Sequence, residues 1–115
     1  MKLIVAIIQP SKLDAVKQAL AEEEVFRMTV IDAQGFGRQK GSATVFRGDE
    51  IGVNLTRKVE IQLAVNDDFL ERAVAAIIRG GRSGTRGRIG DGKIFVSNIE
   101  EAIRIRTGES GLDAI

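Results

Sequence analysis

The chain is 115 residues long, with a mass of 12.5 kDa, and its 17 basic and 16 acidic side chains give a formal net charge of +1. It has no Cys and no His, which excludes disulfides, thiol nucleophiles, zinc sites built from Cys and His, and imidazole acid–base catalysis. The length suits a single domain, any metal would need oxygen ligands, and the near-neutral balance gives no global field to attract nucleic acid or an anionic membrane.

The first half of the chain predicts a strand, a helix and a second strand. Residues 3–8 form a continuous apolar run, typical of a strand buried on both faces, that ends before Pro10. Ser11 is placed to cap a helix, and residues 29–33 suit a second strand. The apolar face of that helix would consist of Leu13, Val16 and Leu20.

The second half repeats this plan. Residues 59–65 alternate apolar and polar side chains as a half-buried strand does, and Asn66 or Asp67 is expected to cap the helix that follows. Gly80 stands where a left-handed glycine often ends a helix, and residues 93–97 supply a fourth strand. The apolar face of this helix would be Leu70, Ala73, Val74 and Ile77. Two such units predict an α+β ferredoxin-like βαββαβ sandwich, with an antiparallel sheet and both helices on one face.

No part of the chain predicts a membrane span or a signal peptide. The longest apolar runs, 3–8 and 73–78, are six residues each, whereas a span needs about 20. Met1 and Lys2 lead directly into the first strand, and no small-residue cleavage site follows. We therefore expect a cytoplasmic protein.

Three segments do not fit the regular pattern and are candidates for function. Residues 37–56 are longer than an ordinary connection and contain three glycines after Gly37, so they predict either an extended hairpin or a flexible loop. Residues 80–93 interleave six glycines with Arg82, Arg86, Arg88 and Lys93. Such a stretch can cradle phosphate with backbone N–H groups and cationic side chains, although residues 89–93 could also be a plain tight turn.

The third segment, residues 101–106, alternates arginine with isoleucine. Ile103 and Ile105 would face the core, leaving Arg104 and Arg106 on the other face. The pair is either an edge strand protected by charge or a clamp for phosphate oxygens near the glycine loop. Residues 35–41 resemble a dinucleotide fingerprint with one residue too many and no helical pattern after them, and no Walker motif is present.

Together these segments closely resemble the PII signal-transduction family of nitrogen regulatory proteins, nearly from end to end. The matching segments are MKLI at 1–4, GFGRQKG at 35–41, RG at 47–48, GDGKIFV at 90–96 and RIRTGE at 104–109. The resemblance implies one ferredoxin-like domain over residues 1–115 that assembles as a homotrimer. Within it, residues 37–56 would be the T-loop, residues 80–92 the phosphate-binding B-loop, and residues 100–115 a C-terminal segment.

The resemblance also implies a function. The family comprises non-enzymatic sensors that bind ATP or ADP in clefts between subunits, respond to 2-oxoglutarate together with Mg²⁺ and ATP, and control partners through the T-loop. The expected partner is an ammonium transporter or another nitrogen-metabolism protein, with membrane contact only through a transporter and no role for nucleic acid. A divergent sensor of adenine nucleotides that ignores 2-oxoglutarate and controls a different transporter or enzyme is the alternative.

Residue roles carry over by position from the family. The nucleotide would be bound by Thr29, Gly35, Gly37, Arg38, Gln39, Gly87, Arg88, Gly90, Asp91, Gly92, Lys93, Arg104 and Arg106. 2-Oxoglutarate would be bound by Gln39, Lys40, Gly41, Lys58, Ile89 and Gly90, with Lys58 pairing with a carboxylate. Gln39 would ligate Mg²⁺ beside the phosphates and 2-oxoglutarate. Partner docking would use Arg47, Gly48, Asp49, Glu50 and Ile51.

Some positions depart from the family pattern. The chain has no Tyr, and Phe46 and Ile51 stand where many relatives have tyrosine, so nucleotidylation of a T-loop tyrosine is chemically impossible. Asp49 stands where some relatives carry a phosphorylated serine. The B-loop is longer than usual, and Gln9 and Arg57 replace a common Lys and Pro.

Two functions from other classes fit the same fold. An RNA-binding sandwich would stack bases on aromatic side chains of the central strands, yet residues 59–65 contain none. A small phosphate hydrolase would use the arginines as a clamp and, without His, Cys or Tyr, a carboxylate such as Asp91 as its base.

Overall fold

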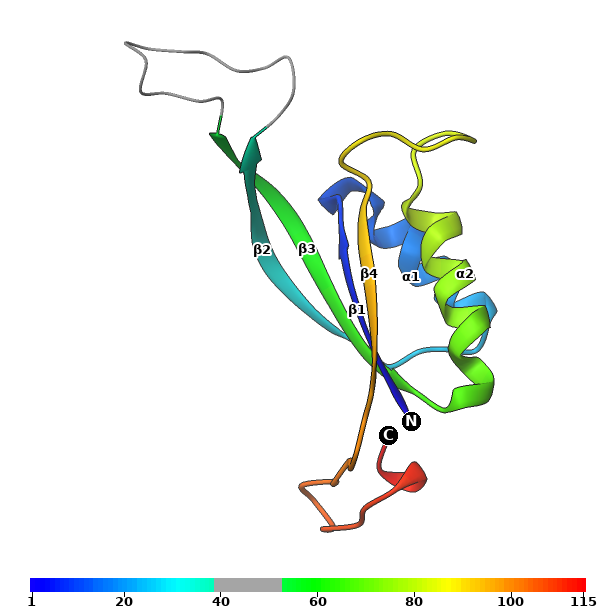
Figure 1. Ribbon diagram of the computed structural model, residues 1–115. Coiled ribbons are helices and arrows are strands. Elements are labelled where there is room, and N and C mark those ends of the chain that lie inside the picture. The colour runs from blue at the N-terminus through cyan, green and yellow to red at the C-terminus, as the bar shows by residue number, and fades with distance from the viewer. Residues whose placement is uncertain (39–52) are drawn as a thin grey trace.

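The computed structural model describes residues 1–38 and 53–115 (Figure 1). Its main elements are β1 (Lys2–Ile8), α1 (Leu13–Glu22), β2 (Thr29–Arg38), β3 (Val53–Val65), α2 (Leu70–Gly81) and β4 (Gly92–Asn98). The four strands form one antiparallel sheet in the order β2-β3-β1-β4, and Figure 1 shows both helices on the same face of it. This arrangement confirms the predicted ferredoxin-like fold. Of the helices in the two described ranges, none is long and apolar enough to span a lipid bilayer.

The hairpin of β2 and β3 is longer than predicted. The two strands pair from Thr29↔Gln62 to Arg38↔Val53, and Figure 1 shows the far end of this ladder extending beyond the helices. Gly35 lies beyond the predicted second strand, and Gly37 begins the segment predicted as either a hairpin or a loop. Continuous pairing with β3 places both glycines in β2. The ladder favours the extended-hairpin interpretation up to Arg38 and from Val53 onward. The predicted roles of Gln39, Lys40, Gly41, Arg47, Gly48, Asp49, Glu50 and Ile51 fall outside the described residues.

The core lies between the sheet and the helices. Ile4, Ala6 and Ile8 of β1 are buried, whereas Val5 and Ile7 on the other face are only half-buried. The prediction that β1 is buried on both faces is therefore wrong within a single chain, because the helices cover only one face of the sheet. The other buried apolar residues are Val16, Ala19, Leu20, Val25, Val59, Ile61, Leu63, Val65, Ala73, Ala76 and Ile77.

Each helix begins with a short 3₁₀ turn instead of a side-chain cap. Pro10–Lys12 and Asp67–Phe69 form these turns, and Ser11 lies inside the first, so its predicted capping role is wrong. Asn66 occupies the N-cap position of the second turn, but its side chain makes no capping bond. Backbone hydrogen bonds of these turns, such as the one from Lys12 N to Gln9 O at 3.0 Å, take the place of a side-chain cap at the start of each helix.

The helix α2 runs through Gly80 and ends at Gly81, so Gly80 is not the predicted left-handed terminator. A Cβ atom at Gly80 would lie 2.7 Å from Val16 Cα in α1. Glycine is needed here for close contact between the helices and not for its backbone angles.

Candidate functional site

The carboxylate of Asp91 organises the B-loop. Its Oδ2 accepts hydrogen bonds from the backbone N–H groups of Ser83 and Arg88, both at 2.9 Å. Its Oδ1 accepts from the Ser83 hydroxyl at 2.6 Å and from Gln9 Nε2 at 3.0 Å. The two bonds from Ser83 and the one from the Arg88 amide lower the pKa of Asp91 to about 2. An ionised carboxylate that accepts four internal donors is a poor general base, which argues against the hydrolase alternative.

Four glycines of this loop have backbone conformations that other residues rarely adopt. Gly84, Gly87, Gly90 and Gly92 have φ angles of 65°, 77°, 102° and 118°. A Cβ atom at Gly92 would lie 1.7 Å from the carbonyl oxygen of Ile7. The loop therefore turns sharply and joins β4 at a point where only glycine fits against β1.

Lys58 of β3 reaches the same loop. Its Nζ donates a hydrogen bond to the carbonyl oxygen of Gly90 at 2.8 Å, and Gln9 Nε2 lies 3.4 Å from the same oxygen. A Cβ at Gly35 of β2 would lie 3.3 Å from Lys58 Cγ, so Gly35 also borders this lysine. The structure thus brings together Gly35, Lys58 and Gly90, all of them predicted site residues. Ile89, also predicted, is fully exposed beside Gly90.

Lys58 and Lys93 lie on the side of the sheet without helices. Ile7 pairs with Glu60 of β3 and Lys93 of β4, so these three residues share one face. Lys58 lies two residues from Glu60 on β3 and therefore points the same way. Lys58 and Lys93, two of the three predicted ligand-binding lysines, consequently face the same side of the sheet at the B-loop end.

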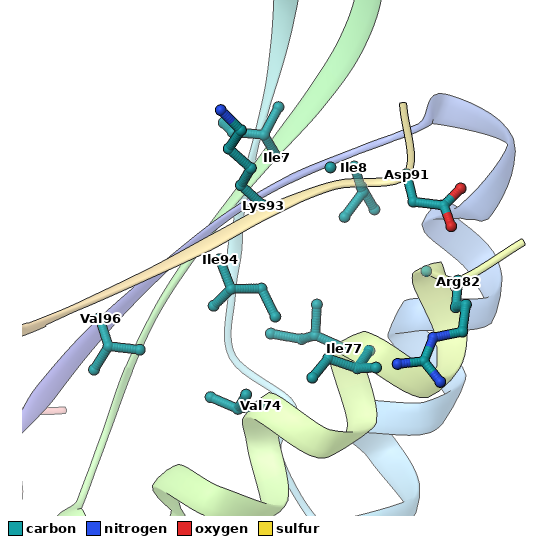
Figure 2. Close-up of a pocket in the computed structure, with 12 residues that line it drawn as sticks. Ile7, Ile8, Val74, Ile77, Arg82, Asp91, Lys93, Ile94 and Val96 are labelled. Carbon is teal, nitrogen blue, oxygen red and sulfur yellow. The ribbon is translucent and has the colours of Figure 1, made fainter. Parts of the chain in front are cut away.

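An apolar cavity of about 410 Å³ lies on the opposite side of these strands, between the sheet and α2. Figure 2 shows Ile94 and Val96 of β4 directed toward Val74 and Ile77 of α2, with Lys93 directed away from them. The cavity was not predicted from the sequence. Arg82, Asp91 and Lys93 border the cavity at its B-loop end, but Lys58 does not line it. Because most of its wall is aliphatic, it does not suit phosphate.

The predicted arginine clamp is not a strand. Residues 105–107 form a turn, closed by an isolated bridge between Ile103 and Ser110. Ile103 is 60% and Ile105 100% exposed, so the predicted packing of these side chains on the core is wrong in the single chain. Arg104 donates to the carbonyl oxygen of Asp113 and lies 3.4 Å from Glu109, so its side chain is bound within the C-terminal segment.

The two basic elements lie at opposite ends of β4. Figure 1 shows the B-loop at one end of this strand and the C-terminal segment that carries Arg104 and Arg106 at the other. A seven-residue strand separates them by roughly 20 Å, at about 3.3 Å per residue. The prediction that they converge is therefore wrong within one chain. Thr29 begins β2 and also lies away from the B-loop, whereas Gly35, Gly37 and Arg38 belong to the B-loop half of the hairpin.

Sequence reasoning missed two residues that shape the site. In the sequence, Gln9 is only a departure from the family pattern, and nothing distinguishes Ser83. Both donate to Asp91, which the sequence predicts as a nucleotide ligand or a base. The separation of Gln9 from Asp91 along the chain gives no signal, since only the pairing of β1 with β4 brings them together.

Residues 1–109 match the family model for nitrogen regulatory protein P-II. The chain belongs to the P-II family. It is 61% identical over 115 residues to a nitrogen regulatory protein P-II from Bradyrhizobium diazoefficiens and 56% identical to one from Rhodospirillum rubrum, with each pair covered in full. It is also 48% identical to nitrogen regulatory protein GlnK1 from Methanosarcina mazei, over the whole chain and 97% of that protein.

Family membership settles the broad role of the chain. Proteins of this family are regulatory signalling proteins and not enzymes, so the chain is a non-enzymatic signalling protein, as predicted. Residues 1–38 and 53–115 contain no cluster of three or more acidic side chains that could hold a metal ion. The predicted magnesium ligand, Gln39, lies outside those ranges, so its role stays a prediction.

Proposed function

We propose that the chain senses adenine nucleotides and 2-oxoglutarate at sites shared between copies of itself and controls a nitrogen-metabolism partner through residues 37–56. The observation that carries this proposal is the B-loop, which Asp91 holds in place while Lys58 and Lys93 face one side of the sheet beside it. Loop N–H groups and lysines are the donors that phosphate oxygens accept. Family membership supports the adenine nucleotide as the ligand, because P-II proteins bind adenine nucleotides.

The position of the arginines supports a site made by two chains. Arg104 and Arg106 are too far from the B-loop of their own chain to bind the same phosphates. In an oligomer, the C-terminal segment of one copy could lie against the B-loop of the next. We therefore assign Lys93 and the B-loop glycines to one wall of each cleft, and Thr29, Arg104 and Arg106 to the other. A homotrimer is the assembly that the family resemblance implies.

The 2-oxoglutarate site would use Lys58. Its ammonium group donates a hydrogen bond to the Gly90 carbonyl at the edge of the proposed phosphate site. There it could pair with a carboxylate of 2-oxoglutarate. Mg²⁺ would be held by the ATP phosphates, 2-oxoglutarate and Gln39, an all-oxygen set that suits this ion. Asp91 is an unsuitable ligand for it because its oxygens already accept internal hydrogen bonds. The proposed partner, an ammonium transporter or another nitrogen-metabolism protein, would contact residues 47–51.

Isothermal titration calorimetry tests the ligands. ATP and ADP are expected to bind, and 2-oxoglutarate only when Mg²⁺ and ATP are present. Gln39→Ala should spare ADP binding and abolish 2-oxoglutarate binding. Nucleotide binding without any response to 2-oxoglutarate would support the divergent-sensor alternative, and no nucleotide binding would refute the proposal.

Mixing variants tests the shared site. Lys93→Ala alone, and Arg104→Ala with Arg106→Ala, should each lose most ATP binding. When the two variant chains are unfolded together and refolded as mixed oligomers, an intact loop from one chain can meet intact arginines from the other. Recovery of tight ATP sites in the mixture supports the two-chain site. If mixed oligomers form and bind no better than the separate variants, the site does not have this composition.

A further inference from the structure

We propose that Gln9 is a positioning residue of the B-loop, which holds the loop against the end of β1 so that it keeps the conformation that receives phosphate. The structural part of this proposal is independent of the ligand, and the nucleotide part rests on the proposed function. The carboxamide of Gln9 reaches two neighbouring loop acceptors, Asp91 Oδ1 at 3.0 Å and the Gly90 carbonyl oxygen at 3.4 Å.

Within the described residues, the hydrogen bonds of the loop are of two kinds. Most are internal, since Asp91 binds Ser83 and Arg88, and the Asp91 N–H donates to the Arg88 carbonyl at 3.1 Å. These bonds fix the shape of the loop but do not attach it to the sheet. Gly92, the first residue of β4, pairs with Ile8 of β1. The rest of the loop is attached to the sheet side by two side chains, Gln9 after β1 and Lys58 of β3.

The two attachments differ in chemistry. Lys58 is a flexible cation, and any anion bound beside the loop competes with the Gly90 carbonyl for its ammonium group. Gln9 is neutral, and its amide nitrogen carries two protons that can serve both acceptors at once. Its bond to the ionised Asp91 is charge-assisted and is the shorter of the two. Gln9 therefore keeps Gly90 and Asp91 in place when Lys58 turns to a ligand.

Gln9 also secures the geometry of Asp91 itself. The carboxylate can bind the Ser83 and Arg88 amides together only while it stays in one orientation. The bond from Gln9 to Oδ1 restrains that orientation from outside the loop, and Lys12 adds a favourable charge nearby. Loss of this restraint should weaken the hydrogen bonds of the Ser83 and Arg88 amides to Asp91 together.

The test measures hydrogen exchange of the Ser83 and Arg88 amides by NMR in the ligand-free protein. Gln9→Leu removes the donors at similar size, Gln9→Glu places a carboxylate against Asp91, and Gln9→Lys restores a donor. We expect the first two variants to exchange about tenfold faster at both amides, as the loss of one charged hydrogen bond implies, and Gln9→Lys to stay near the parent. Gln18→Leu, an exposed glutamine of α1, is the matched control and should change neither amide.

A parallel ATP titration of the same variants completes the test. Gln9→Leu and Gln9→Glu should weaken ATP binding, and Gln9→Lys should retain it. Unchanged amide exchange in Gln9→Leu would overturn the proposal, even if ATP binding fell. Faster exchange with unchanged ATP affinity would overturn the positioning role. If the parent bound no nucleotide, the proposed function would fail, while the exchange rates would still decide whether Gln9 holds the loop.

Discussion

The backbone of Gly80 in α2 lies directly against the backbone of Val16 in α1. A Cβ atom at Gly80 would lie 2.7 Å from Val16 Cα and 2.8 Å from the Ala15 carbonyl oxygen. Real Cβ atoms do not approach backbone atoms so closely, so the distance between the helices depends on this glycine. Both helices cover the core side of the sheet, and the contact at Gly80 sets how closely they pack there.

Gly80→Ala should destabilise the fold by about 1–3 kcal/mol, because the helices must separate to admit a methyl group. Gly81→Ala is the matched control: its Cβ would meet only Val16 Cγ2 at 3.7 Å and Ile8 Cγ2 at 3.8 Å. The control should be neutral or more stable. Urea unfolding measures both, and equal midpoints for the two variants would show that the helix contact is not limiting.

A second prediction concerns the glycine that joins the B-loop to β4. Gly92→Ala places a Cβ against the Ile7 carbonyl, so β1 and β4 must part at this end. We expect a loss of more than about 3 kcal/mol in unfolding free energy. Gly84→Ala has open space around it but a φ angle of 65°, and should cost only about 1 kcal/mol. Similar losses from the two substitutions would indicate that backbone strain, and not the contact with Ile7, dominates at Gly92.

These glycines show what the sequence could and could not predict about the fold. Apolar periodicity located both helices and all four strands, since burial against one core imposes those periods. Sequence spacing cannot distinguish a glycine that ends a helix in the left-handed conformation from a glycine that lets two helices pack closely, so the prediction for Gly80 is wrong. The predicted end of the second strand is too early, because only pairing with β3 shows that Gly35 and Gly37 lie in a strand.

The site was predictable in its parts but not in its arrangement. The motif at residues 90–93 and Lys58 were identified by resemblance, and the structure does bring Lys58 onto Gly90. The distance between the B-loop and Arg104 follows from strand direction, which no local motif encodes. The roles of Gln9 and Ser83 depend on contacts across the fold and had no local signal.

The third prediction concerns pH. The folded pKa of Asp91, about 2, lies below its ordinary value of 3.8, so its carboxylate contributes to stability fully above 3.8 and loses that contribution as the pH falls toward 2. The stability difference between the parent and Asp91→Asn should therefore shrink over this interval in urea unfolding. The NMR shifts of the Ser83 and Arg88 amides should titrate with a midpoint near 2. Ser83→Ala should raise that midpoint, and a parent midpoint near 3.8 would contradict the hydrogen-bond geometry.

The last prediction separates the two arginines of the C-terminal segment. Arg104 is tied to Asp113 and Glu109, whereas Arg106 makes no hydrogen bond or ion pair within the parts of the chain that the structure describes. Arg106→Ala should therefore leave the unfolding free energy unchanged. If the proposed two-chain site is correct, it should weaken ATP binding by about 1.5–3 kcal/mol, the worth of a charged hydrogen bond. Arg104→Ala should weaken ATP binding and also loosen the C-terminal segment.

Arg72→Ala is the control for charge alone. It removes an equal charge from α2, where Arg72 lies over the ring of Phe69 at 4.2 Å. Calorimetry should show ATP binding close to the parent in this variant. If Arg72→Ala weakened ATP binding as much as Arg106→Ala, the effect would come from net charge and not from a contact. ATP affinity unchanged by Arg106→Ala would remove Arg106 from the site, because this exposed arginine has no partner among residues 1–38 and 53–115 whose loss could hide the effect.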